Sequence, residues 1–140
     1  MLTVAAGKHP NVPVARTGLQ ELPFLQAFDA VMCVNAIENV GPEDWPTVLV
    51  RLRNAGRPEA CLYVTVELGD EDDVRRAYEK ARAAGHPAVP GEDFDGTRYH
   101  YYPEPEAIQV WLQGAGLGIV DEREADEYRH LLLRRRSSGT

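Results

Sequence analysis

The sequence predicts an α/β fold with parallel central strands, helices on both faces of the sheet and a C-terminal antiparallel hairpin. Two short apolar runs rich in valine, residues 28–34 and 60–66, are typical of strands buried on both faces of a covered parallel sheet. A segment of helical periodicity separates them, which is the order of a strand–helix–strand unit. Two further segments, residues 117–124 and 127–134, are expected to pair as the hairpin at one edge.

The segments before the first strand are short. Residues 1–9 resemble the end of a helix, because Pro10 stops a helix at the residue before it. Residues 11–16 alternate valine with small or polar residues, which predicts a short strand. Thr17-Gly18 and Leu22-Pro23 then predict a loop.

Three helices are expected after the first strand. The first begins near residues 41–44, where acidic residues favour the positive end of the helix dipole, and ends at residues 54–56. Its apolar face consists of Trp45, Val48, Leu49 and Leu52. The second covers residues 70–84, and the third covers residues 105–114 with Ile108, Trp111 and Leu112 facing inward. Residues 85–97 are rich in proline, glycine and acids, so we expect a long loop that is mobile or covers a site.

Composition restricts the class of protein. The chain has 140 residues, 44% of them hydrophobic and 26% charged, so we treat residues 1–140 as a single globular domain. Its net charge of −7 argues against nucleic acid or an acidic membrane as the main partner. No apolar stretch is long enough to cross a bilayer and no signal-peptide pattern begins the chain, so we expect a cytoplasmic protein. Cys33 and Cys61 lie inside apolar runs without zinc spacing, which indicates buried, reduced thiols.

Polar residues follow the two central strands. Asn35 and Glu38 come after the first strand, and Glu67 ends the second. Ligands of open α/β sheets bind beyond the carboxyl ends of the strands, so we place the functional site there. Partial burial would raise the pKa of Glu67 and suit it to act as a general base, although a solvated acid that caps the following helix explains it equally well.

His100 lies among Tyr99, Tyr101 and Tyr102. These rings could line a pocket for a substrate, or they could simply pack under the long loop. Glu38, Glu67 and His100 together have no recognisable metal-ligand spacing, so we predict no metal site.

A resemblance covers nearly the whole chain. Its segments are Leu22-Pro23-Phe24, Phe28-Asp29-Ala30-Val31, Glu38-Asn39-Val40, Arg57-Pro58, Leu62-Tyr63-Val64-Thr65-Val66-Glu67 and Ala115-Gly116-Leu117. In order and spacing this series resembles the second half of class I S-adenosylmethionine-dependent methyltransferases, especially bacterial enzymes that act on small molecules. The resemblance implies a Rossmann-like methyltransferase fold that lacks the first strands.

The resemblance also implies a set of binding residues. The loop that cradles the adenine of S-adenosylmethionine corresponds to residues 17–20, with Gly18, Leu19 and Gln20 at the cofactor. The end of the strand after it, Cys33, Val34 and Asn35, lies along the cofactor. The ends of the two central strands face the methyl acceptor, a small organic molecule, which places Asn35, Glu38 and Glu67 near it. From the ring cluster described above we add Tyr101 and Tyr102 to the acceptor site, and we assign Glu67 and His100 to catalysis.

The chain departs from the family pattern in three places. The glycine-rich cofactor loop and the acid that holds the ribose are absent, as if the chain were the later part of a domain. Gly18 stands where the family often has aspartate. Residues 58–60 read Pro-Glu-Ala where the family has Pro-Gly-Gly, so we expect strain in a turn that needs positive φ.

Three hypotheses follow. The chain is a methyltransferase, possibly truncated, that acts on a small organic acceptor. Alternatively, it is a non-catalytic remnant that binds a small molecule or a protein. In the third, it pairs with another chain, because the missing first strand would leave an open edge at Val31. Residues 12–16, or the same edge of a second copy in a homodimer, could cover that edge.

Overall fold

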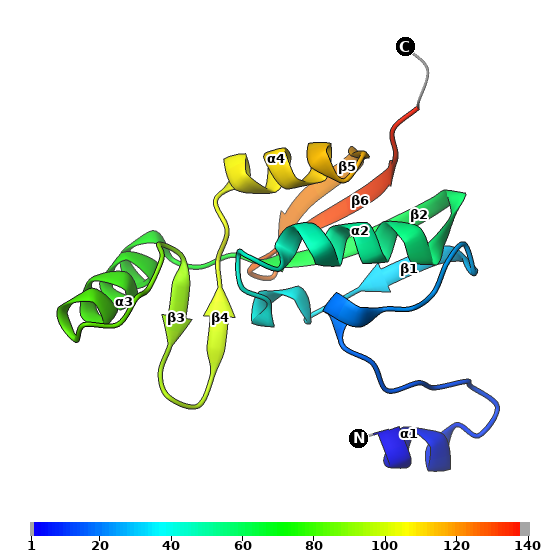
Figure 1. Ribbon diagram of the computed structural model, residues 1–140, viewed down its shortest axis with the longest axis horizontal. Coiled ribbons are helices and arrows are strands. Elements are labelled where there is room, and N and C mark those ends of the chain that lie inside the picture. Colours follow the sequence, from blue (N-terminus) through cyan, green and yellow to red (C-terminus); the bar gives the residue numbers. More distant parts are fainter. Residues whose placement is uncertain (1, 138–140) are drawn as a thin grey trace.

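The computed structural model describes residues 2–137 and contains two sheets, four α-helices and two short 3-10 helices (Figure 1). The helices are α1 (Leu2–Lys8), η1 (Leu19–Glu21), η2 (Ile37–Asn39), α2 (Trp45–Ala55), α3 (Glu71–Ala83) and α4 (Pro105–Gly114). The strands are β1 (Phe28–Cys33), β2 (Gly56–Glu67), β3 (Glu92–Phe94), β4 (Tyr99–Tyr101), β5 (Leu117–Ala125) and β6 (Tyr128–Arg135).

The larger sheet has the strand order β1-β2-β6-β5. β1 and β2 are parallel, and Val31 lies opposite Leu62 in their register. β6 is antiparallel to both of its neighbours, β2 and β5. The structure therefore confirms the parallel pair of central strands and the terminal hairpin, and with them the predicted α/β class.

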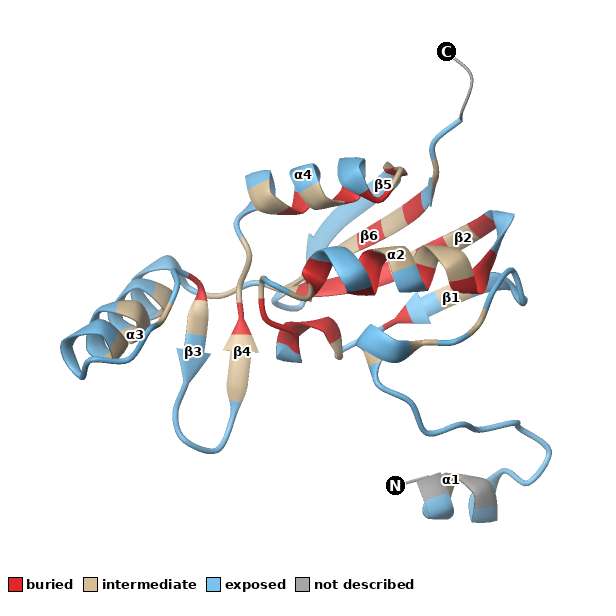
Figure 2. Cartoon of the chain, in the orientation of Figure 1, coloured by how far each residue is buried: buried red, intermediate tan, exposed pale blue. Residues whose placement is uncertain are grey.

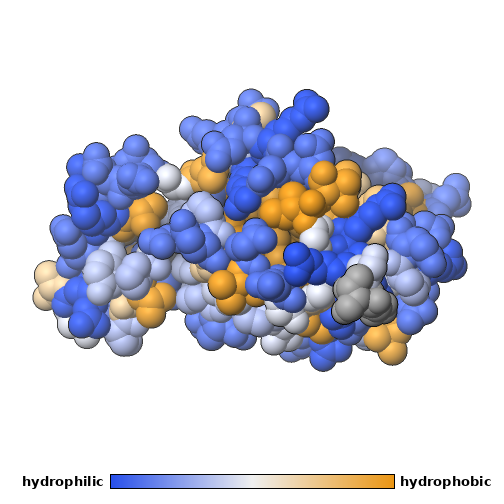
Figure 3. Space-filling model, turned by 90° about the horizontal axis from the view of Figure 1, so that it is seen from above, coloured by the Kyte–Doolittle hydropathy of each residue, from blue (hydrophilic) through white to orange (hydrophobic). Residues whose placement is uncertain are grey.

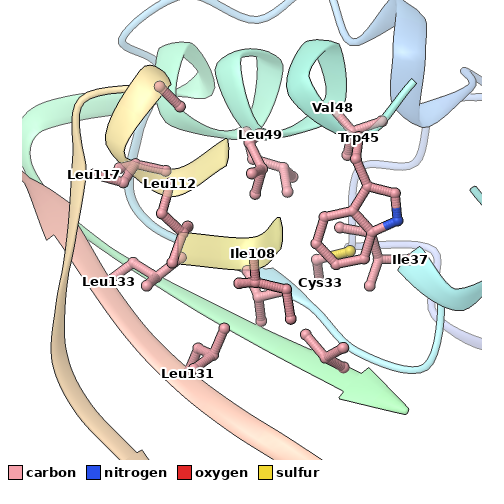
Figure 4. Close-up of a cluster of buried hydrophobic side chains, with 14 of the residues drawn as sticks. Cys33, Ile37, Trp45, Val48, Leu49, Ile108, Leu112, Leu117, Leu131 and Leu133 are labelled. Carbon is pink, nitrogen blue, oxygen red and sulfur yellow. The ribbon is translucent and has the colours of Figure 1, made fainter. Parts of the chain in front are cut away.

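The hydrophobic core lies between this sheet and two helices. Figure 4 shows Leu49 of α2, Ile108 and Leu112 of α4, and Leu131 and Leu133 of β6 pointing toward one another. Both helices present their apolar residues at the spacing that the sequence predicted. Where α2 and α4 meet, the rings of Trp45 and Trp111 stack with centroids 5.3 Å apart.

The opposite face of the sheet is open among residues 2–137. Met32 of β1 is 70% exposed, whereas its neighbour Cys33 points into the core and is buried. On the open face, Tyr63 and His130 form a hydrogen bond between β2 and β6. The expectation of helices on both faces, and of strands buried on both, therefore differs from the structure. α2 and α4 cover one face, because their apolar stripes are the ones that contact the core cluster.

The N-terminal segment is more exposed than the sequence suggested. α1 ends just before His9 as expected, but residues 12–16 form no strand and are exposed (Figure 2). Their alternating valines pair with no strand among residues 2–137, and β1 is the edge of the sheet in this part of the chain. The prediction of a strand at 11–16 is therefore wrong, since alternation alone does not supply a hydrogen-bonding partner.

The long loop contains a strand that the sequence analysis did not identify. β3 pairs antiparallel with β4, with Asp93 opposite His100 in the register. Together with α3, this hairpin projects from the four-stranded sheet (Figure 1). Asp70 caps α3 by accepting hydrogen bonds from the backbone N–H groups of Asp72 and Asp73.

The start of β2 removes one expected source of strain. β2 begins at Gly56, and its register with β1 shifts between Gly56 and Cys61, where a Cβ added to Gly56 would lie 2.7 Å from the Cβ of Ala60. The chain therefore does turn tightly here, but neither Glu59 nor Ala60 has a positive φ. In the described part of the chain, the non-glycine residues with positive φ are Gln26, Asn35, Asp126 and Glu127. The prediction of strain at residues 58–60 is therefore wrong.

Between residues 2 and 137, no helix has the length and apolar character needed to cross a membrane. The surface seen in Figure 3 is mostly hydrophilic, with smaller hydrophobic patches near its middle.

Candidate functional site

The carboxyl ends of β1 and β2 open at the same edge of the sheet, because the two strands are parallel and adjacent. Asn35 follows β1 with a φ of 52°, in the left-handed region that asparagine tolerates better than most residues. Its backbone N–H donates a hydrogen bond of 2.9 Å to Oγ1 of Thr65 in β2. This bond fixes the direction in which the chain leaves β1.

Glu67 and His100 meet at this edge. Oε2 of Glu67 lies 2.9 Å from Nδ1 of His100, and the side chains are 21% and 17% exposed respectively. On the other side of the ring, the guanidinium of Arg98 lies 3.1 Å from Nε2 of His100. Because a guanidinium can only donate, a hydrogen bond at this contact requires Nε2 to accept, which places the ring proton on Nδ1.

Two tyrosines complete the surroundings of Glu67. Tyr102 follows β4, and its hydroxyl lies 3.3 Å from Nδ1 of His100. Tyr128 lies directly opposite Glu67 in the register of β2 and β6. Burial, and secondly the charge of Glu67, raise the pKa of each tyrosine, so both rings stay neutral phenols near Glu67.

Glu38 lies in the same region. Its helix η2 contacts both β2 and β4. The Glu38 side chain is only 6% exposed, and its Oε2 has no hydrogen-bond partner among residues 2–137. The charge of Glu38 contributes, after larger causes, to the raised pKa of Tyr102 and of Tyr128. Glu38 and Glu67 are therefore two carboxylates that both lie near Tyr102 and Tyr128.

The residues assigned to the cofactor lie on two segments. Cys33 is buried in the core, and burial together with the nearby Glu38 raises the pKa of its thiol to about 11. Val34 and Asn35 are exposed at the strand end, as a ligand there would require. Gly18 and Gln20 are exposed, while Leu19 begins η1, which packs against α2.

The two tyrosines assigned to the acceptor are placed differently. Tyr101 is buried, and its ring contacts Trp45 at a centroid distance of 6.5 Å. It belongs to the core, because residues alternate across β4 and Tyr101 faces the side away from His100. Tyr102 lies beside His100 and is the tyrosine of this pair that reaches the site.

A cleft of about 750 Å³ lies between α3 and the segment that carries β3. Ala77 and Ala81 of α3 form one wall, and Phe94 and Tyr99 contribute rings to the other. Residues of the long loop therefore line this cleft. Glu67, His100 and Tyr102 are not among the residues that line it.

Sequence reasoning missed three residues of the site: Thr65, Arg98 and Tyr128. Thr65 stands inside an apolar run, and a hydroxyl at the end of a buried strand was a usable signal. Arg98 and Tyr128 carried no such signal, because their closeness to Glu67 depends on strand registers. Among residues 2–137, no group of three or more His, Cys, Asp or Glu side chains could hold a metal ion.

The chain is similar to known proteins in structure but not in sequence. No family model and no curated protein matches the chain in sequence. Among solved structures, 1,6-didemethyltoxoflavin-N1-methyltransferase of Burkholderia thailandensis, with bound 1,6-didemethyltoxoflavin and S-adenosylhomocysteine, superposes with a TM-score of 0.69 at 14% identity. S-adenosylmethionine-dependent methyltransferases of Clostridium acetobutylicum and Methanosarcina mazei superpose with TM-scores of 0.68 and 0.65, at 14% and 15% identity.

The chain is shorter than these enzymes. The match with the Burkholderia enzyme covers 97% of this chain but 56% of that one. The corresponding shares are 97% and 71% for the Clostridium protein, and 86% and 65% for the Methanosarcina protein. The chain has the fold of class I S-adenosylmethionine-dependent methyltransferases, over part of their length.

Proposed function

We propose that this protein is an S-adenosylmethionine-dependent methyltransferase, or part of one, that acts on a small organic acceptor. The observation that carries the proposal is the meeting of Glu67, His100 and Tyr102 beyond the carboxyl ends of two parallel strands. The fold supports it, since structural neighbours at low identity are methyltransferases and one holds S-adenosylhomocysteine.

The residues at the end of β1 suit the cofactor. Val34 offers an exposed apolar side chain, and Asn35 offers an amide beside it, so adenosine would find both an apolar surface and hydrogen-bonding groups. Gly18 and Gln20 at η1 would provide the second contact. When bound, S-adenosylmethionine supplies a methyl group on a positively charged sulfur.

Glu67 and His100 have the geometry of a proton acceptor and its positioning residue. Nδ1 of His100 lies 2.9 Å from Oε2 of Glu67, and Arg98 contacts the ring from the other side. Glu67 would accept a proton from the acceptor's hydroxyl or amine while that atom attacks the methyl group. Alignment of the two reacting atoms is the main requirement of such a displacement, and the strand ends are rigid supports for it.

Calorimetric titration of this chain with S-adenosylhomocysteine tests the proposal. We expect a saturable heat that is lost when Val34→Asp places a charge on the apolar contact. Leu25→Asp, at another exposed apolar residue, is the matched control and should bind normally. Absence of heat at millimolar ligand, with folded protein, would contradict cofactor binding by this chain.

A second candidate function is a non-catalytic binding module that pairs with a second copy. The observation in its favour is the open edge of β1, which no strand among residues 2–137 covers. Light scattering distinguishes a monomer from a homodimer, and a monomer at high protein concentration would contradict the homodimer.

Both cysteines are free thiols, which supports a cytoplasmic location for either function.

A further inference from the structure

We propose that Glu38 and Glu67 bind the ammonium group of a basic amine, so that the acceptor is an amine and not an acid or a simple alcohol. For the transfer step this rests on the proposed function, whereas the binding of the cation rests on the two carboxylates and the rings beside them.

The unpartnered oxygen of Glu38 is the first observation. A buried carboxylate oxygen without a hydrogen-bond donor is costly, because burial removes the water that would otherwise solvate it. Oε2 of Glu67 is also buried, and its nearest partner, His100, does not complete an aligned hydrogen bond. Glu38 therefore has an oxygen without any donor, and Glu67 has one whose nearby donor, His100, is not aligned with it. An ammonium group presents three N–H donors with a compensating positive charge.

The rings around these carboxylates are the second observation. Tyr102 and His100 lie with ring centroids 6.0 Å apart in an edge-on arrangement, and Tyr128 stands opposite Glu67 on β6. Neutral aromatic faces attract cations, and burial keeps both tyrosines neutral. The combination of carboxylates and ring faces is suited to an organic cation.

The other charges near the two carboxylates agree with this choice. Asp93 adds a further negative charge near Tyr102. Arg98 is the cation that contacts His100, and it does so at Nε2, on the side of the ring opposite to the Nδ1 that faces Glu67. Both carboxylates would repel an acidic ligand, which disfavours it.

In the proposed transfer step, the ammonium nitrogen would give one proton to the Glu67 carboxylate, and the freed electron pair would form the bond to the methyl carbon. The carbon–sulfur bond breaks with its electron pair left on sulfur, so that the sulfonium of S-adenosylmethionine becomes a thioether. The methylated product is still an ammonium ion, which Glu38 continues to bind.

Ligand titrations followed by NMR test the inference on this chain, with benzylamine, benzyl alcohol and benzoate as probes. These share a ring and differ in charge. We expect benzylamine to shift the ring signals of Tyr102 and Tyr128, and to bind at least about tenfold more tightly than the other two. Glu38→Gln should weaken benzylamine about tenfold, because it removes the charge and keeps the shape. Glu106→Gln, at an exposed acid of α4, is the matched control and should have no effect.

Two results would overturn the inference: equal binding of the three probes, or unchanged benzylamine affinity in folded Glu38→Gln. If Glu38→Gln fails to fold, Tyr102→Leu replaces it and should weaken benzylamine by several fold, with unchanged affinity as the contrary result. The calorimetric titration with S-adenosylhomocysteine separates this inference from the proposed function. Benzylamine binding without S-adenosylhomocysteine binding would retain the cation site and reject methyl transfer, and the reverse would reject the cation site alone.

Discussion

At the scale of single residues, the site depends on a few buried polar contacts that join segments far apart in the sequence. The hydrogen bond from the Asn35 N–H to Thr65 ties the turn after β1 to β2. The contact between Glu67 and His100 ties β2 to the small hairpin. These two contacts determine where the strand ends present their side chains.

Replacement of Thr65 tests the first contact. Thr65→Val keeps the shape but leaves the Asn35 N–H without its acceptor, so we expect the free energy of unfolding to fall by about 1–2 kcal/mol. Thr65→Ser keeps the hydroxyl and should lose clearly less. Urea denaturation measures both values, and an equal loss in the two variants would show that the hydroxyl contributes nothing.

The two cysteines should differ in reactivity. Cys33 is buried and the pKa of its thiol is raised to about 11, whereas Cys61 is half-buried on the open side. Thiolate is the reactive form, so we expect iodoacetamide at pH 8 to label Cys61 first and Cys33 only on unfolding. Mass spectrometry of the peptides identifies the labelled residue, and early labelling of Cys33 would contradict its burial.

The raised pKa of Cys33 also predicts a pH dependence of stability. The folded protein holds this proton more tightly than the unfolded chain, whose thiol has a pKa of 9.0. The protonated Cys33 thiol makes its full contribution to the free energy of unfolding below pH 9. This contribution, at most about 3 kcal/mol, is lost as the pH rises toward about 11. Cys33→Ala removes the effect, so its unfolding free energy should fall less than that of the unchanged protein over this range. Parallel curves for the two proteins would contradict the prediction.

At the scale of elements, the two faces of α4 should respond very differently to substitution. Leu112 is buried against the sheet, while Val110 on the same helix is exposed. Leu112→Ala should lower the unfolding free energy by about 2–5 kcal/mol, and Val110→Ala should change it by less than about 0.5 kcal/mol. Thermal or urea unfolding measures both, and similar losses in the two variants would contradict the placement of the core.

The sequence predicted most elements because their signals are local. The periodic apolar residues of α2 and α4 and the valine runs of β1 and β2 each identify an element without knowledge of its partner. β3 could not be predicted in this way, since a strand of three residues exists only through its pairing with β4. The strand expected at residues 12–16 was wrong for the same reason, because it had a pattern but no partner.

The candidate site was predictable in part. Asn35, Glu38 and Glu67 were identified because strand ends can be read from the sequence. The contact of Glu67 with His100 depends on where the hairpin packs, and the burial of Tyr101 instead of Tyr102 depends on which face of β4 meets the core. Neither property is encoded in the neighbouring residues alone.

At the scale of the whole molecule, the sheet is covered on one face and open on the other. An apolar run such as that of β1 predicts cover on both faces, but Met32 is exposed while Val31 packs against the core. The match covers 56% of the Burkholderia methyltransferase, so the chain has the arrangement of part of that fold.

Paired substitutions in β1 test the open face. Met32→Glu should change the unfolding free energy by less than about 0.5 kcal/mol, because the side chain already meets solvent. Val31→Glu should be strongly destabilising, by several kcal/mol, since it places a carboxylate against the core. Similar destabilisation by both would show that the face is covered in solution, for example by a second copy.

The central claim is that the ends of β1 and β2 form a binding site for the cofactor of methyl transfer. A titration of the ¹⁵N-labelled chain with S-adenosylhomocysteine, followed residue by residue by NMR, tests it most directly. We predict saturable shifts that are largest in the amides of Val34, Asn35 and residues 18–20, with α4 and β5 little affected. Spectra that do not change at millimolar ligand, or shifts confined to elements away from the strand ends, would contradict the claim.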